Sequence, residues 1–100
     1  MRIETVTSVQ NPKIKELIAF GEKSRLRRER GIFIVEGRRE LGHCLNAGFL
    51  PFCVFVCGEI LGEEVLEEVV GSAIAAHPPC KIVQVSYNVY EKMAYRGSTE

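Results

Sequence analysis

The sequence has no hydrophobic run long enough to cross a membrane. Its longest apolar stretch, residues 49–57, falls far short of the roughly 20 residues that a membrane helix needs. The polar start Arg2-Ile3-Glu4 also differs from a signal peptide, which requires an apolar segment. No glycine-rich phosphate loop of the G-x-G-x-x-G or P-loop type occurs, which disfavours a self-contained nucleotide-binding enzyme. These absences predict a cytoplasmic protein without a membrane partner.

The few cysteines and histidines form no recognisable metal or catalytic motif. Cys53 and Cys57 are four residues apart and would lie on one face of a strand, where His43 or His77 could complete a metal site. Their spacing is not that of a zinc-binding motif, however, and a free cysteine is commonly a small core hydrophobe. With 46% hydrophobic residues the chain needs no disulfides, and an intracellular protein keeps its thiols reduced. We therefore expect no metal, no disulfide and no catalytic residue.

Basic residues are absent from the middle of the chain, so the net charge differs between the N-terminal part and the middle part of the sequence. Residues 41–80 hold no Lys or Arg and five Glu, whereas residues 1–40 hold ten basic and six acidic residues. The whole chain of 100 residues has a formal net charge of zero, and its length suits a single domain. A phosphate ligand should therefore approach the N-terminal part and be repelled by the acidic part.

Apolar residues recur at helical spacing in some segments and form short continuous runs in others. The pattern predicts helices over residues 12–22, 38–47 and 62–76, and a short last helix that Ser86 caps and that extends to Ala94. Interior strands, apolar on both faces, are expected over residues 32–35 and 52–57, and a third strand is expected over residues 81–85. Strands that alternate with helices of this length favour crossover connections and a mostly parallel sheet. The expected fold class is α/β, a three-layer α/β/α sandwich with a small sheet.

A dense group of basic residues surrounds the strand expected over 32–35. Guanidinium groups bind phosphate oxygens in a fixed forked geometry and keep their charge at any working pH. This composition favours recognition of a polyanion, and a nucleic-acid backbone is the first partner to test. A solvated basic surface is the simpler alternative. The seven residues are Lys23, Arg25, Arg27, Arg28, Arg30, Arg38 and Arg39.

The segment after that strand, residues 36–39, is expected where ligands gather in open α/β sheets, beyond the carboxyl end of a strand. Gly37 would permit a sharp turn into the helix or a close approach of the backbone to a ligand. Arg39 could hold a phosphate or a ribose, or it could pair with Glu36 or Glu40. Glu36 could orient a basic side chain, accept from a ribose hydroxyl, or cap the following helix.

Glutamates recur at helical spacing opposite the apolar stripe of the helix expected over 62–76. Such a face is ordinarily solvated, although it could dock onto a basic surface of a further domain or of a second subunit. The residues are Glu63, Glu64, Glu67 and Glu68.

An ordered set of motifs runs through the chain. Its centre is Gly31-x-Phe33-x-Val35-Glu36-Gly37-x-Arg39. Before and after the centre stand Thr7-Ser8, Asn11-Pro12-x-Ile14-Lys15, Ala47-Gly48 and Val85-Ser86-x-x-Val89-x-x-Lys92-x-Ala94-Tyr95-Arg96-x-Ser98-Thr99-Glu100. Over essentially its whole length the chain resembles the N-terminal substrate-binding domain of the SpoU (TrmH) family of RNA 2'-O-ribose methyltransferases.

The resemblance implies a fold like that of small ribosomal and kink-turn-binding proteins, in a domain that binds ribosomal or transfer RNA. It implies that methyl transfer from S-adenosylmethionine takes place in a knotted C-terminal domain beyond residue 100, so that residues 1–100 bind no cofactor. It also implies that the full-length protein is a homodimer.

We expect the RNA-binding residues to be Lys13, Lys15, Arg25, Arg27, Arg28, Arg30, Glu36, Arg38, Arg39 and Arg96. Arg38 stands where many relatives have proline, and would make an extra phosphate contact. Tyr95 beside Arg96 is a candidate for stacking on an unpaired base.

Two functions remain open on the sequence alone. In the first, the domain binds structured RNA and delivers it to a ribose methyltransferase domain. In the second, it is a protein interaction or dimerisation module without direct RNA contact, and the arginines only keep its surface soluble.

Overall fold

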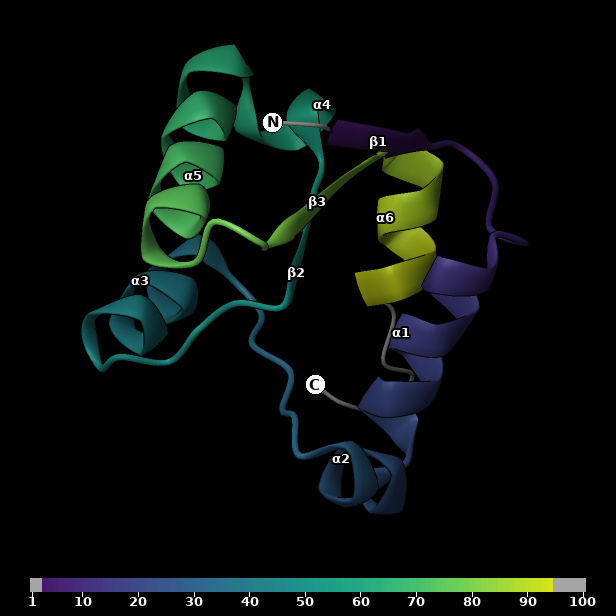
Figure 1. Ribbon diagram of the computed structural model, residues 1–100. Coiled ribbons are helices and arrows are strands. Elements are labelled where there is room, and N and C mark those ends of the chain that lie inside the picture. Colours follow the sequence, from purple (N-terminus) through teal and green to yellow (C-terminus); the bar gives the residue numbers. More distant parts are fainter. Residues whose placement is uncertain (1–2, 95–100) are drawn as a thin grey trace.

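The chain folds as a small sheet between two layers of helices (Figure 1). A computed structural model describes residues 3–94. In chain order the elements are β1 (Ile3–Val6), α1 (Pro12–Glu22), α2 (Ser24–Arg30), α3 (Arg38–Asn46), β2 (Cys53–Val56), α4 (Gly58–Leu61), α5 (Glu63–Ala76), β3 (Lys81–Val85) and α6 (Tyr87–Ala94).

The sheet has three parallel strands in the order β1-β3-β2. In the register of the sheet, Ile3 lies opposite Ile82 and Cys53 opposite Lys81. Parallel neighbours cannot be joined by a tight hairpin, so the helices between the strands serve as crossover connections. The parallel sheet that the sequence predicted is therefore present, with β3 at its centre.

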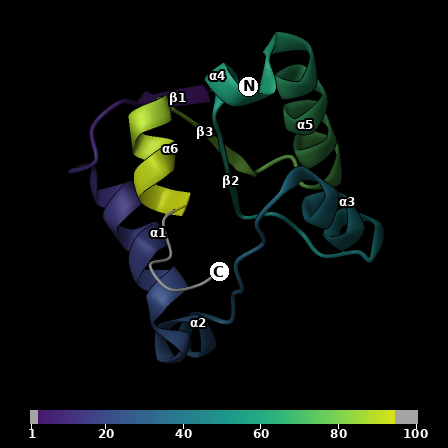
Figure 2. The same ribbon diagram turned by 180° about the vertical axis from the view of Figure 1, so that it is seen from behind.

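Two apolar cores lie on opposite faces of the sheet and define the layers. On one face α5 and α3 cover a core of Val54, Val56, Val69, Val70, Ala73, Cys80 and Ile82. On the other face α1 and α6 cover a core of Val6, Ile14, Cys57, Val83, Val85 and Val89. Figures 1 and 2 show the sheet between these two helical layers. The predicted three-layer α/β/α architecture is confirmed.

The helices predicted from apolar periodicity form where local signals begin and end them. α1 starts as expected, because the Asn11 side chain accepts a hydrogen bond from the Lys13 amide at 2.9 Å and Pro12 occupies the first turn. α3 follows Gly37, whose φ of 105° is a conformation that other residues rarely adopt. α3 and α5 then end within one residue of the predicted boundaries.

The start of α6 differs in one respect from the expectation. Ser86 does precede the helix, and its carbonyl accepts from the Tyr90 amide. Its hydroxyl, however, donates to the side chain of Asn88, and the Tyr87 amide donates to a carboxylate oxygen of Glu59 at 2.6 Å. The cap therefore comes from α4, a helix that the sequence pattern did not indicate.

The prediction of a buried strand over residues 32–35 is wrong. This segment is extended but pairs with no strand of the described chain, and the Phe33 side chain is 53% exposed. Its ring packs edge-on against Phe49, with 5.1 Å between the ring centroids. A run of β-branched and aromatic residues favours an extended conformation. To become a β-strand, however, the segment must form hydrogen bonds with a neighbouring strand, and its own sequence cannot specify that neighbour.

The strand predicted over 52–57 is present, as β2, but it is an edge strand and not an interior one. β1 was not predicted, since three of its four residues are exposed and only Val6 is buried. In residues 3–94 we find no helix of the length and apolarity that a membrane span requires.

Candidate nucleic-acid interface

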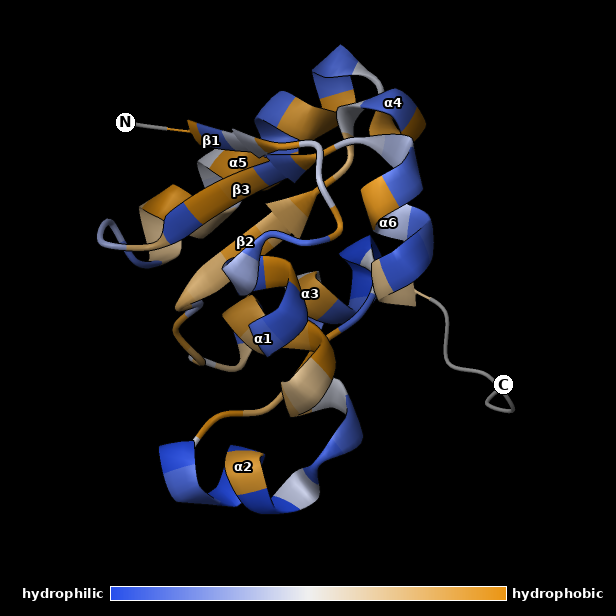
Figure 3. Ribbon diagram, turned by 90° about the vertical axis from the view of Figure 1, so that its right-hand side faces the viewer, coloured by the Kyte–Doolittle hydropathy of each residue, from blue (hydrophilic) through white to orange (hydrophobic). Residues whose placement is uncertain are grey.

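The arginine-dense stretch forms a helix of its own. α2 spans seven residues, none of them buried, and ends at Gly31 in a left-handed conformation with φ 67°. Figure 3 shows it as one of the most hydrophilic elements, and Figures 1 and 2 place it beyond the end of α1 and away from the sheet. A short helix at the periphery can present its side chains to a large polyanion without steric hindrance.

Arg27 differs from the other arginines of α2 because it binds the chain itself. Its guanidinium donates to the carbonyl oxygen of Phe20 at 2.5 Å and to that of Gly21 at 3.3 Å. These carbonyls belong to the last turn of α1, where backbone acceptors lack helical partners. Arg27 therefore joins the two helices, a structural role that competes with the RNA contact predicted for it.

The remaining arginines of α2 are exposed, and their contacts are weak. Arg25 lies 3.8 Å from Glu29, and Arg30 lies 3.7 Å from Glu16, with all four side chains more than half exposed. The Arg30 guanidinium also lies 5.5 Å from the centre of the Phe20 ring, and that of Arg28 only reaches the Ser24 hydroxyl at 3.5 Å. Exposed ion pairs contribute about 0–1 kcal/mol. A phosphate could therefore displace these carboxylates at little cost.

We use the term α2 surface for four exposed cations at this end of the molecule. Lys23 has no ion-pair partner among residues 3–94. The α2 surface comprises Lys23, Arg25, Arg28 and Arg30.

The predicted lysines of α1 lie away from this surface. Lys13 is in the first turn of α1, where it pairs with Glu4 of β1, and that hydrogen bond raises the Lys13 pKa. α1 has 11 residues, so its two ends are roughly 15 Å apart along the axis. Lys15 is exposed near the same end as Lys13. These two residues could join the α2 surface only through an extended ligand.

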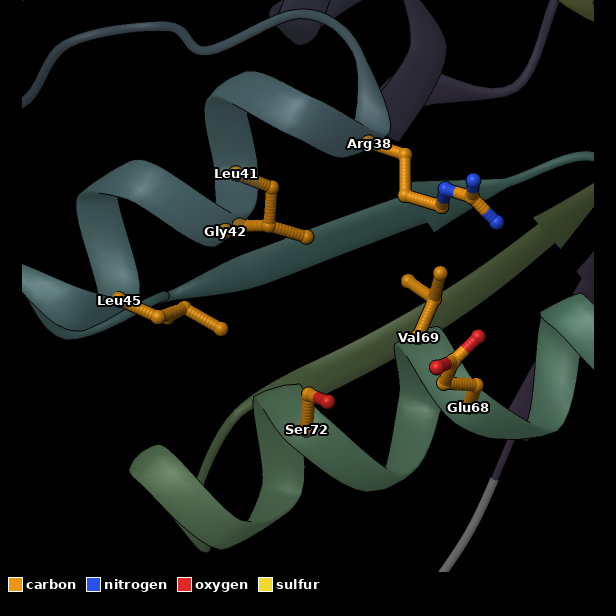
Figure 4. A pocket seen from close by; sticks show the side chains of 7 residues that line it. All are labelled: Arg38, Leu41, Gly42, Leu45, Glu68, Val69 and Ser72. Carbon is orange, nitrogen blue, oxygen red and sulfur yellow. The ribbon is translucent and has the colours of Figure 1, made fainter.

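Arg38 and Arg39 form a separate basic site at the start of α3. The extended segment of residues 31–37 separates α3 from α2, and the two helices lie apart in Figures 1, 2 and 3. Both arginine side chains are exposed, and Arg38 also lines a groove between α3 and α5 (Figure 4). The seven clustered basic residues of the sequence are thus divided between two surfaces.

Two predicted RNA-binding residues remain, Glu36 and Arg96. Glu36 is exposed immediately before Gly37. Arg96, with the stacking candidate Tyr95, lies outside the described residues.

An exposed aromatic patch near the start of β2 was missed by the sequence reasoning. Four large apolar side chains of this patch are between 53% and 71% exposed, and the Lys81 ammonium lies 5.8 Å from the centre of the Phe52 ring. The signal was present in the sequence as an apolar run longer than β2 requires. The patch comprises Phe33, Phe49, Leu50 and Phe52.

The cysteine and histidine side chains of the described residues do not come together as a metal site. Burial raises the pKa of the Cys53 thiol to about 11, so the thiol is protonated at neutral pH. Cys57 is buried in the core and His43 is exposed on α3. Within residues 3–94 there is no group of three or more His, Cys, Asp or Glu side chains that could hold a metal ion.

A domain of this fold, with a projecting basic helix, has the character of a binding module, and the comparison with known families specifies which kind. Residues 11–100 match the MRM3-like substrate binding domain. The match covers most of the chain, so the chain belongs to this family of substrate-binding domains of RNA methyltransferases. No curated protein and no solved structure gives a significant match.

Proposed function

We propose that this domain binds ribosomal or transfer RNA for an S-adenosylmethionine-dependent 2'-O-ribose methyltransferase of the SpoU (TrmH) family. The observation that carries the proposal is the α2 surface, a group of exposed guanidiniums on a chain that belongs to a family of substrate-binding domains. The methyl donor binds in a knotted domain beyond residue 100, in a cytoplasmic protein that acts as a homodimer.

The contribution of the domain is positioning. Transfer to a ribose oxygen requires that the target nucleotide be held in a reactive geometry, and positioning supplies a large part of enzymatic rate enhancement. Forked contacts from Arg25, Arg28 and Arg30 to phosphates would fix the RNA backbone without reading its sequence. Recognition at this surface is therefore electrostatic and sensitive to salt.

Fluorescence anisotropy with a labelled 12-nucleotide single-stranded RNA tests the proposal. If the four cations of the α2 surface each contact one phosphate, log K should fall with log salt at a slope of about −3. The double variant R25Q/R28Q should reduce this slope by about half, because each lost phosphate contact removes about 0.7.

The control is K81Q/K92Q, which removes the same charge from β3 and α6. It should leave the salt slope close to that of the wild type. Equal losses in both double variants, or binding that does not depend on salt, would contradict the role of the α2 surface.

The exposed aromatic patch favours a second function, a protein interaction or dimerisation module. Contiguous exposed apolar side chains such as Phe49, Leu50 and Phe52 commonly mark contacts between proteins. Sedimentation at several concentrations distinguishes the two functions, because F52S should weaken association and R25Q/R28Q should not. Association without salt-dependent RNA binding would support this second function instead.

A further inference from the structure

The groove between α3 and α5 combines an apolar floor with two opposite charges. Its volume is about 330 Å³, near the lower end of the roughly 300–1,000 Å³ that small-molecule sites occupy. Leu41, Leu45 and Val69 point into it from the two helices, and Ser72 adds a hydroxyl (Figure 4). A single nucleotide suits these dimensions better than a helix or a duplex.

The charged groups of the groove are Arg38 on α3 and Glu68 on α5. Both side chains extend toward the space between the helices in Figure 4. They do not pair with each other, and neither has an ion-pair partner among residues 3–94. An unpaired cation and an unpaired anion at one groove can bind two different parts of the same ligand.

We propose that this groove binds one unpaired guanine nucleotide of the RNA, with Arg38 on its phosphate and Glu68 on its base. This inference rests on the proposed function and specifies which nucleotide the domain recognises. Within the described chain, Arg38 and Glu68 therefore place an unpaired guanidinium and an unpaired carboxylate at one groove.

The chemistry of the bases selects guanine. A carboxylate has two acceptor oxygens and no donor. Guanine presents two neighbouring donors, N1–H and the N2 amino group, on its Watson–Crick edge, and both oxygens of Glu68 can accept from them. Adenine and cytosine each place an acceptor beside their amino group, and uracil has a single N–H between two carbonyls. Each of these bases would leave a carboxylate oxygen facing an acceptor.

The apolar floor and the location of Arg38 fit the same ligand. Unpaired bases bury their faces against apolar side chains when a protein reads their edges. Arg38 occupies the first position of α3, next to Arg39, so a backbone that passes over α3 would bring a phosphate to the mouth of the groove.

The test compares three single-stranded RNAs that differ only at one central nucleotide, which is guanosine, inosine or adenosine. The wild type should bind the guanosine RNA about tenfold more tightly than the adenosine RNA, with inosine between them, because inosine lacks the N2 amino group. E68Q should remove this preference by weakening binding of the guanosine RNA and strengthening binding of the adenosine RNA, because an amide can donate to adenine N1 and a carboxylate cannot. E67Q makes the same charge change on the neighbouring residue, which does not line the groove, and should keep the preference.

A second variant tests the groove by steric blocking. Gly42 lines the groove, and a Cβ added there meets nothing within 4 Å, so G42L should fill the groove while favouring the helix. It should abolish the guanosine preference without loss of folding, as circular dichroism would verify.

The outcomes separate this inference from the proposed function. Salt-dependent binding without a guanosine preference, or a preference that survives both E68Q and G42L, overturns the inference and leaves the proposed function standing. Weaker self-association of G42L with an unchanged guanosine preference identifies the groove as a protein contact and also overturns it. Absence of any RNA binding removes both.

Discussion

The guanidinium of Arg27 donates to the carbonyl oxygen of Phe20 at 2.5 Å and thereby fixes the basic helix α2 to the end of α1. The neighbouring Arg28 reaches only the hydroxyl of Ser24, at 3.5 Å and on the exposed side. Two adjacent arginines of one basic helix thus make different contacts, and the pair permits a matched comparison.

R27Q should therefore reduce stability, and R28Q should reduce RNA affinity. The contact of Arg27 joins a charged donor to a partly buried carbonyl, so we expect a loss of about 1–2 kcal/mol in the free energy of unfolding. R28Q should stay within about 0.5 kcal/mol of the wild type. Urea unfolding measures the first effect and RNA anisotropy the second. Equal losses of stability would contradict the structural role of Arg27.

Glu59 and Tyr87 provide a second test, because the cap of α6 comes from another helix. E59A should lower the free energy of unfolding by about 0.5–2 kcal/mol, since the Tyr87 amide loses its acceptor. E59Q retains an acceptor oxygen and should lose less. E67A, on the exposed face of α5, serves as the control and should change little. If E59A and E67A behave alike in urea unfolding, the cap contributes nothing.

The thiol of Cys53 makes stability depend on pH above neutrality. Burial raises its pKa from 9.0 to about 11, so the folded state holds a proton that the unfolded state releases at lower pH. The stabilisation is complete below pH 9 and is lost as the pH rises from 9 to 11. Because the side chain is partly exposed, we expect less than about 2 kcal/mol.

The variant C53A isolates this effect. It cannot titrate at residue 53, so its urea midpoint should fall less steeply than that of the wild type between pH 9 and 11. All other ionisable side chains are the same in both proteins, so the difference between the two pH curves reports chiefly on residue 53. Parallel curves would mean that the Cys53 pKa is not raised.

The parts of the fold that were predictable carry local signals. α1 has Asn11 and Pro12 at its start, α3 follows Gly37, and α5 has an apolar stripe. α2 was missed because SRLRRER has no apolar period; it is a helix because arginine, leucine and glutamate favour helices and Arg25 lies four residues before Glu29.

The candidate site was predictable in composition but not in arrangement. The sequence places Arg38 close to the arginines of α2, yet the structure turns Arg38 toward α5. That separation depends on the path of residues 31–37 and on the packing of α3 against α5, which are tertiary features. Glu68, likewise, was interpreted as part of a solvated face because nothing local indicates the groove.

Gly37 should be a position where any side chain destabilises the protein. Its φ of 105° is accessible almost only to glycine, so G37A should cost about 1–3 kcal/mol although a Cβ would meet no atom within 4 Å. G71A is the control, because Gly71 is helical and equally unobstructed, and should stabilise α5 by about 0.8–1 kcal/mol. Thermal unfolding of the two variants should therefore shift in opposite directions, and shifts of the same sign would exclude backbone conformation as the cause.

Hydrogen exchange tests the unpaired state of the segment between α2 and α3. The amides of Phe33, Ile34 and Val35 have no hydrogen bond within residues 3–94, whereas β3 is paired on both sides. Exposed, unpaired amides exchange with almost no opening free energy, and amides of a central strand approach the global value. We therefore expect fast exchange over residues 33–35 and slow exchange over residues 82–84. Protection of residues 33–35 equal to that of β3 would mean that the segment joins the sheet as a strand, as the sequence pattern had predicted.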